Sequence, residues 1–310
     1  MGQPKVELRQ RMDLGQVLTN FFEFVKFNLK AYANVFLRYN GIFILLLLGI
    51  SYMLVSGFFG MMTASQAFGG SQQESMTSAA VIGLGAIALF IVLVLVMALN
   101  HSLSAVYMIS YVNNEDPDKE IDPKQVWKKT MASMGNIVVF ILLLIVIYIG
   151  FGIISVILAI IPFLGIIAQY VIQFAMIGWI GIAFMVMLNE GRGVGDSFGE
   201  AWNLMTKNFW KCVGNNFILW LISMVFALFI LSVPGIIIGF WTWHAVDVGD
   251  EVLTSVLYKL IYTIMLCGLL VCSAFMQSLI QFGNGVLYFS LNEAKYNKHL
   301  RAKIEQIGSE

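Results

Sequence analysis

Long apolar stretches without Asp, Glu, Lys or Arg alternate along this chain with short polar segments. An α-helix needs roughly 20 mostly apolar residues to cross the hydrocarbon core of a bilayer. The uncharged stretch 136–188 has room for two such helices, and Pro162 and Gly165 predict a tight turn between them. The pattern therefore predicts six spans, at 39–61, 79–110, 136–160, 164–188, 212–240 and 256–289. In the fifth, Pro234-Gly235 predicts a kink or an end.

The composition supports a membrane protein. Hydrophobic residues make up 59% of the 310-residue chain, charged residues only 12%, and the mean hydropathy is +0.83. Soluble domains have about 25% charged residues. The formal net charge is zero, so nothing indicates a nucleic-acid partner. We expect an all-α integral membrane protein.

The basic residues predict the orientation, because Lys and Arg favour cytoplasmic segments. With six spans, every Lys and Arg except Lys259 lies in the segment before the first span, in the second or fourth loop, or after the last span. We therefore expect both termini on the cytoplasmic side. The ends of the domain are expected to be a tail at 1–12 and a cytoplasmic tail at 291–310, around a six-span domain at 13–290.

A short amphipathic segment precedes each odd-numbered span, at about 13–38, 122–134 and 196–211. In the first, apolar residues such as Val17, Phe21 and Tyr32 recur at helical spacing. In the third, the polar stripe begins at Glu200. The weakly similar copies suggest an internal repeat of one module, in which a cytoplasmic interfacial helix leads into a hairpin of two spans.

The starts of these segments resemble capping boxes, in which two side chains satisfy exposed amides at a helix start. Asp13 and Asp122 are each followed by Gln at the third position, and Ser197 is followed by Glu200. We expect Asp13, Asp122 and Ser197 to be helix caps.

Aromatic and basic side chains on these segments suit the headgroup boundary of a membrane. Either they only anchor the spans, or they form a collar that docks lipid or a partner. The expected interfacial contacts are Phe22, Lys26, Lys30, Trp127, Lys128, Trp202, Lys207 and Trp210.

No span has a charged residue near its centre, which argues against a coupled transporter. The few polar residues in the spans have two readings: an intramembrane pocket for a head group or substrate, or hydrogen bonds between helices, which is the reading we favour. They are Asn100, His101, Gln169, Gln173, Gln277, Gln281 and Asn284.

Other candidate chemistry is weak. Cys212, Cys267 and Cys272 lie in apolar stretches and predict buried hydrophobes. An acidic group near 244–251 has ligands for a hard cation, but a solvated loop explains it better. No catalytic constellation occurs, so we expect no enzyme activity, cofactor or metal.

The residues from Phe21 to Arg38, and Asp196-Ser197-Phe198-Gly199-Glu200-Ala201-Trp202 before the fifth span, carry a loose likeness to a known group. Over roughly 13–290 the chain resembles poorly characterised bacterial six-span proteins related to the membrane domain of some glycerophosphoryl diester phosphodiesterases. The resemblance implies a bacterial cytoplasmic-membrane domain. It does not imply phosphodiesterase activity, since 291–310 has no room for a catalytic barrel.

Two functions remain open. The first is a non-enzymatic scaffold or accessory subunit of the bacterial inner membrane, which engages membrane lipid, another membrane protein or a second copy of itself. The second is a permease-like protein that moves a small amphipathic or lipidic molecule through the six helices.

Overall fold

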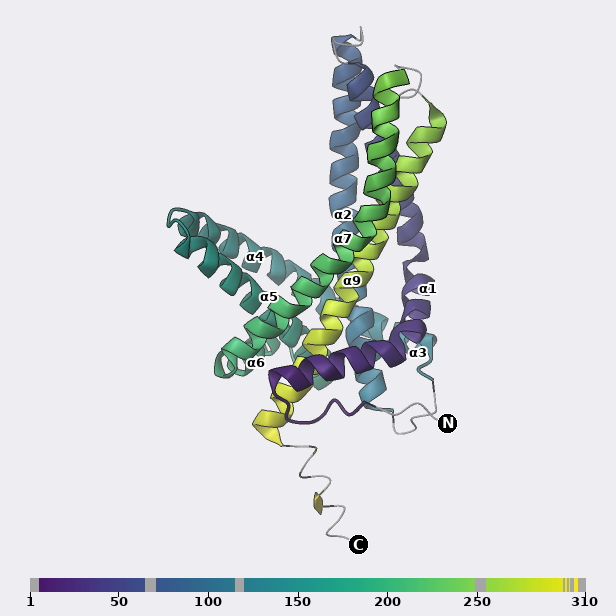
Figure 1. Cartoon of the computed structure of the whole chain (residues 1–310). Helices are drawn as coiled ribbons and strands as arrows, with labels where there is room; N and C mark the ends of the chain where they lie inside the picture. Colours follow the sequence, from purple (N-terminus) through teal and green to yellow (C-terminus); the bar gives the residue numbers. More distant parts are fainter. Residues whose placement is uncertain are drawn as a thin grey trace. The chain divides into compact units, whose positions relative to one another are not determined.

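Every regular element in the computed structural model of the protein is an α-helix, over the residues that it describes (Figure 1). The described residues are 6–64, 71–114, 120–248, 255–297, 299, 301, 304 and 305. Within 233–248 the backbone is described throughout, but side chains are described only at 235, 236, 239, 240 and 243. The helices are α1 (Leu14–Thr63), α2 (Gln72–Val112), α3 (Pro123–Ala132), α4 (Met134–Ala159), α5 (Leu164–Glu190), α6 (Val194–Lys207), α7 (Phe209–Val248) and α9 (Val256–Tyr296).

In the described part of the chain, six helices are long and apolar enough to cross a membrane: α1, α2, α4, α5, α7 and α9. Each covers one of the six predicted spans, except that α4 ends at Ala159, one residue before the predicted end of the third span. Large apolar side chains such as Phe90 of α2 and Ile149 of α4 are exposed on their surfaces. Lipid is the solvent that makes such surfaces stable, so the helices indicate a multi-pass membrane protein.

The chain forms two compact units. Unit 1 comprises Met1–Phe36, Asn100–Ile222 and Gln277–Glu310, and unit 2 comprises Leu37–Leu99 and Ser223–Met276. Helices α3 to α6 belong wholly to unit 1, whereas α1, α2, α7 and α9 each contribute to both units.

Small residues permit close helix packing in unit 2. A Cβ placed on Gly57 of α1 would lie 2.7 Å from the Ile82 side chain of α2. Phe59 of α1 also meets Tyr262 of α9 edge to face, with ring centroids 5.3 Å apart. Helix α1 therefore contacts both α2 and α9 within this unit.

An aromatic cluster forms part of the core of unit 1. Tyr32 of α1 packs edge-on against Phe282 of α9 and Tyr107 of α2, with centroids 4.7 and 5.4 Å away. The Tyr32 hydroxyl lies 2.8 Å from the Ser104 hydroxyl. Tyr32 is on the buried face of α1 that the helical spacing of Val17 and Phe21 predicts.

The predicted turn between the third and fourth spans is confirmed. Helix α4 ends at Ala159 and α5 begins at Leu164, after Phe163, whose φ is 58°. The two helices lie side by side (Figure 1). Gly165 is required here because a Cβ would collide with the Leu158 carbonyl oxygen of α4.

The segments before the odd-numbered spans differ from expectation in their boundaries. The segment 13–38 is not a separate helix, because α1 continues through it into the first span. Helix α6 ends at Lys207 and Asn208 interrupts the helix, so Trp210 belongs to α7. A kink or a helix end was expected at Pro234-Gly235, and α7 continues through these residues, so the end is ruled out.

The three expected caps have different outcomes. Asp13 and Gln16 form a complete capping box, in which each side chain accepts from the other's backbone N–H at 2.8 and 2.9 Å. Asp122 caps α3 by accepting from the Lys124 N–H. Ser197 is not a cap: α6 begins at Val194, and the Ser197 hydroxyl donates to the Gly193 carbonyl from inside the helix. The helix starts one turn earlier than its polar pattern suggests.

Candidate functional site

The N-terminal segment is fastened to several distant parts of unit 1. The Val6 N–H donates to the Tyr111 hydroxyl at 2.8 Å, and the Arg9 guanidinium donates to Asn113 Oδ1 at 2.6 Å. The Lys211 ammonium donates to the Met12 carbonyl at 2.6 Å. The ends of α2, α7 and the N-terminal segment therefore meet, and the first twelve residues are not a loose tail over their described part.

Charged side chains connect α5, α6 and α9. The Arg192 guanidinium, in the α5–α6 connection, lies 2.8 Å from a Glu190 oxygen and 3.6 Å from a Glu200 oxygen. Glu200 also pairs with Lys295 at 2.7 Å and accepts from the Tyr296 hydroxyl at 3.0 Å. Four alternating charges thus link the helices at this end of unit 1.

Glu200 stays ionised although its side chain is only 8% exposed. Burial acts to raise the pKa of the carboxyl, but the hydrogen bonds from Lys295 and Tyr296 and the charges of Lys295 and Arg192 outweigh it. The pKa of Glu200 is therefore lowered from its usual value. Glu200 was predicted to lie on the polar stripe of this segment, and the structure places it on the buried face of α6 beside Ser197 and Ala201.

Glu190, at the end of α5, is held by uncharged donors as well as by Arg192. One carboxylate oxygen accepts from the Tyr288 hydroxyl at 2.9 Å and from Asn292 Nδ2 at 2.8 Å. Asn189 Nδ2 in turn donates to the Tyr288 hydroxyl at 2.9 Å. These bonds fix the end of α5 against the last turns of α9.

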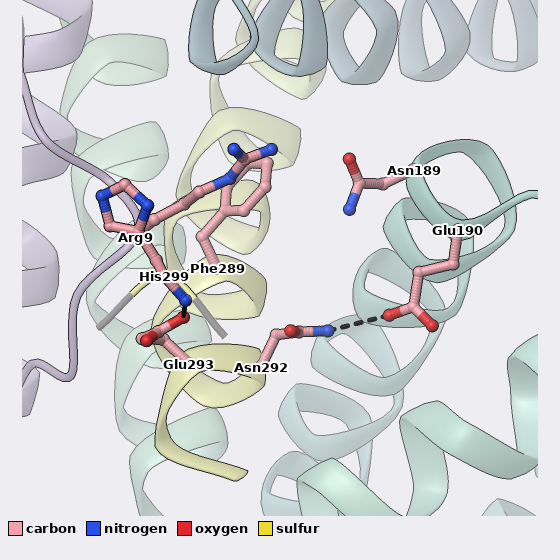
Figure 2. Close-up of a pocket in the computed structure, with 7 residues that line it drawn as sticks. All are labelled: Arg9, Asn189, Glu190, Phe289, Asn292, Glu293 and His299. Atoms are coloured by element: carbon pink, nitrogen blue, oxygen red, sulfur yellow. Dashed lines mark hydrogen bonds between the residues drawn. The ribbon is translucent and has the colours of Figure 1, made fainter. Parts of the chain in front are cut away.

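A polar cavity of about 330 Å³ lies next to this network (Figure 2). Figure 2 shows Arg9 from the N-terminal segment on one side and the end of α5 on the other. The Arg9 guanidinium carbon is 6.0 Å from the centroid of the Phe289 ring. The lining residues are Arg9, Asn189, Glu190, Phe289, Asn292, Glu293 and His299.

The polar residues predicted within the spans do not line this cavity. Gln281 and Asn284 come together against α5, since Gln281 Nε2 lies 3.4 Å from the Gly181 carbonyl and a Cβ on Gly181 would meet Asn284. Asn100 is buried on α2, and its backbone carbonyl accepts a hydrogen bond from the Ser104 hydroxyl.

The other predicted span residues are more dispersed. His101 is half-buried and meets the Phe184 ring edge-on. Gln277 and Gln169 are half-buried, and Gln173 is exposed. Whether any of them surrounds a substrate stays a prediction.

Most of the predicted interfacial residues are at the surface. Phe22 and Trp202 are each 51% exposed and Trp210 is 73% exposed. Trp127 is half-buried. The remaining residues are all exposed lysines: Lys26, Lys30, Lys128 and Lys207.

Sequence reasoning missed the network and the cavity. One signal was available: Glu200 follows Ser197 and precedes Leu204 at helical spacing, so it shares their apolar face and needs a partner. Nothing local indicates that this partner is Lys295. Among the described residues, no group of three or more His, Cys, Asp or Glu side chains is arranged to hold a metal ion. The side chains of the acidic group near 244–251 lie outside the described part.

Comparison of the chain with protein-family models, with curated proteins and with solved structures finds no match.

Proposed function

We propose that the protein is a non-enzymatic scaffold or accessory subunit of the bacterial inner membrane, which engages a membrane partner or lipid through cytoplasmic interfacial helices. In this proposal the six spans form three hairpins, and a cytoplasmic amphipathic segment precedes each hairpin. The likeness to the membrane domain of glycerophosphoryl diester phosphodiesterases agrees with such a role and adds no catalytic activity.

The observation that carries the proposal is the mixed surface of the segments before the spans. On α1, Phe22 and Leu29 are exposed beside Lys26 and Lys30, while Phe24 is completely buried in unit 1. Aromatic and apolar groups beside lysines are typical of helices at the headgroup boundary of a membrane. Such a face is suited to anionic lipid or to a partner at the same depth.

The second such surface lies around the α6–α7 junction. Trp202 and Trp210 are exposed there, and Lys207 lies between them in the sequence. Helix α6 itself is fixed by Phe198, whose ring stacks on Phe140 with centroids 4.7 Å apart, and by the pairing of Glu200 with Lys295. A rigid helix that presents exposed Trp side chains is better suited to docking than a mobile anchor.

The contacts of unit 1 support the cytoplasmic orientation. The N-terminal segment, the α5–α6 connection, the start of α7 and the end of α9 all carry basic residues, and they are joined through Lys211 and Glu200. Segments that the charge pattern assigns to one side of the membrane therefore belong to one compact unit.

A permease remains the alternative. It depends on the amides of the spans, and Gln281 and Asn284 pack directly against Gly181 of α5. This close contact favours a role in helix packing. A hydrogen bond between membrane helices contributes about 1 kcal/mol to their association.

Photo-crosslinking in intact cells tests the docking role. A photoreactive amino acid is placed at Trp202 or Trp210, and at Leu84 of α2 as a control that is also exposed and apolar. We expect a protein adduct of constant mass, or enrichment of one lipid class, at 202 and 210, and bulk membrane lipid alone at 84. The same bulk-lipid pattern at all three positions would show that the segments only anchor the spans.

A further inference from the structure

The cavity in Figure 2 has charges of both signs on its walls. Arg9 provides a guanidinium from the N-terminal segment, whereas Glu190 and Glu293 provide carboxylates from α5 and α9. A cavity that stays empty is lined by apolar side chains, whereas a polar cavity holds water or a polar ligand. Here, Phe289 is the one apolar lining residue among the described residues.

The cationic wall is held in place before any ligand arrives. The Arg9 guanidinium donates through one terminal nitrogen to Asn113 at 2.6 Å, and the group lies over the Phe289 ring. Because an Arg side chain has five N–H donors, this anchoring leaves others for an anion. A planar donor fork suits phosphate in particular.

The opposite wall offers acceptors. Asn189 donates through Nδ2 to Tyr288, and Asn292 donates through Nδ2 to Glu190, so the side-chain carbonyl of each amide remains an acceptor. Glu190 is paired with Arg192 at 2.8 Å. Glu293, which is 7% exposed, adds a second carboxylate, and its Oε2 accepts from the backbone N–H of His299 at 3.1 Å. Carbonyl and carboxylate oxygens are the groups that an alkylammonium requires.

We propose that this cavity binds a small zwitterion in which a primary ammonium and a phosphate are a few bonds apart, as in phosphoethanolamine. The phosphate lies against Arg9, and the ammonium lies against Glu293 and the carbonyl oxygens of Asn189 and Asn292. A cavity of about 330 Å³ is of a size for such a molecule. The same chemistry occurs in the head group of phosphatidylethanolamine and in free phosphoethanolamine.

This inference goes beyond the docking role and does not depend on it, because Trp202 and Trp210 do not line the cavity. The crosslinking result and the binding result can therefore fail separately.

Isothermal titration calorimetry of the full chain in delipidated detergent micelles tests the inference. The probes are phosphoethanolamine, ethanolamine and inorganic phosphate, followed by titration with short-chain phosphatidylethanolamine and phosphatidylglycerol. We expect phosphoethanolamine to bind at least about tenfold more tightly than either fragment, because only the zwitterion engages both walls. Equal affinity for phosphate and phosphoethanolamine would overturn the proposal, and this comparison requires no variant.

The variants Arg9→Gln and Glu293→Gln locate the site. Each is expected to weaken phosphoethanolamine binding about tenfold or more, while Arg11→Gln, an exposed charge of the same segment that does not line the cavity, leaves it unchanged. Unchanged phosphoethanolamine binding in folded Arg9→Gln and Glu293→Gln proteins would also overturn the proposal. Tighter binding of phosphatidylethanolamine than of phosphoethanolamine identifies the lipid as the source, and the reverse identifies a free solute; both outcomes support the shared chemistry.

Discussion

Glu200 of α6 and Lys295 of α9 form an ion pair at 2.7 Å, although 95 residues separate them in the chain. Tyr296 donates to the same carboxylate oxygen at 3.0 Å. The pair joins the helix that leads into α7 to the last turn of the final helix. It therefore fixes the orientation of α6, whose exposed face carries Trp202.

Breaking this pair on one side should destabilise the protein. Glu200→Gln leaves Lys295 without its carboxylate, and we expect a loss of about 1–3 kcal/mol in the free energy of unfolding. Chemical unfolding in detergent, followed by Trp fluorescence, measures the change. Glu23→Gln is the matched control because Glu23 is exposed on α1. If both variants unfold alike, the pair contributes nothing measurable.

The same carboxyl predicts a pH dependence. The fold lowers the pKa of the Glu200 carboxyl below its ordinary value of 4.5, so its contribution to stability is complete above that pH and is lost as the pH falls below it. We expect the difference in unfolding temperature between the wild type and Glu200→Gln to be constant near neutral pH and to shrink below about 4.5. A difference that persists unchanged at pH 3 would show that the stabilising effect of Glu200 does not depend on the ionisation of its carboxyl.

The fastening of the N-terminal segment can be tested at Ser290. Its hydroxyl accepts from the Met12 N–H at 3.1 Å and from Lys211 at 2.9 Å. Ser290→Ala leaves the buried Met12 N–H and the half-buried Lys211 ammonium without this acceptor, which we expect to cost about 1–3 kcal/mol and to speed proteolysis of the segment. Ser273→Ala is the control, because the exposed Ser273 hydroxyl donates only to Leu269 within its own helix. Equal proteolysis rates in the two variants would argue against the fastening.

Gly181 allows α5 to approach α9. A Cβ at this position would lie 2.7 Å from the Asn284 Cβ, so Gly181→Ala must move one helix. We expect a loss of about 1–3 kcal/mol, as for other overpacked sites. Gly152→Ala on α4, where a Cβ meets nothing within 4 Å, should be neutral. Thermal unfolding in the same detergent compares the two, and equal unfolding temperatures would contradict the close packing.

The spans were predictable because a bilayer imposes a strong rule on length and charge. The uncharged stretch 136–188 with Pro162 was enough to place the turn between α4 and α5. The Asp13 cap was predictable for a similar reason, since a capping box is decided by residues three apart.

Features that depend on distant partners were not predictable in the same way. From the sequence, Glu200 belongs to a polar stripe, and only the fold shows that its partner is Lys295. Val6, Leu8 and Met12 are buried, yet they form no helix and show no period that would mark them as core. The cavity beside Arg9 needs three chain segments to be in place at once, which no local pattern records.

We propose that the basic segments gathered in unit 1 face the cytoplasm around six spans. Paired fusions of green fluorescent protein and alkaline phosphatase after Phe163, in the turn between α4 and α5, and after Glu310 measure this most directly in a bacterial host. We expect phosphatase activity alone at Phe163 and fluorescence alone at Glu310. Phosphatase activity at Glu310, or fluorescence at Phe163, would contradict it.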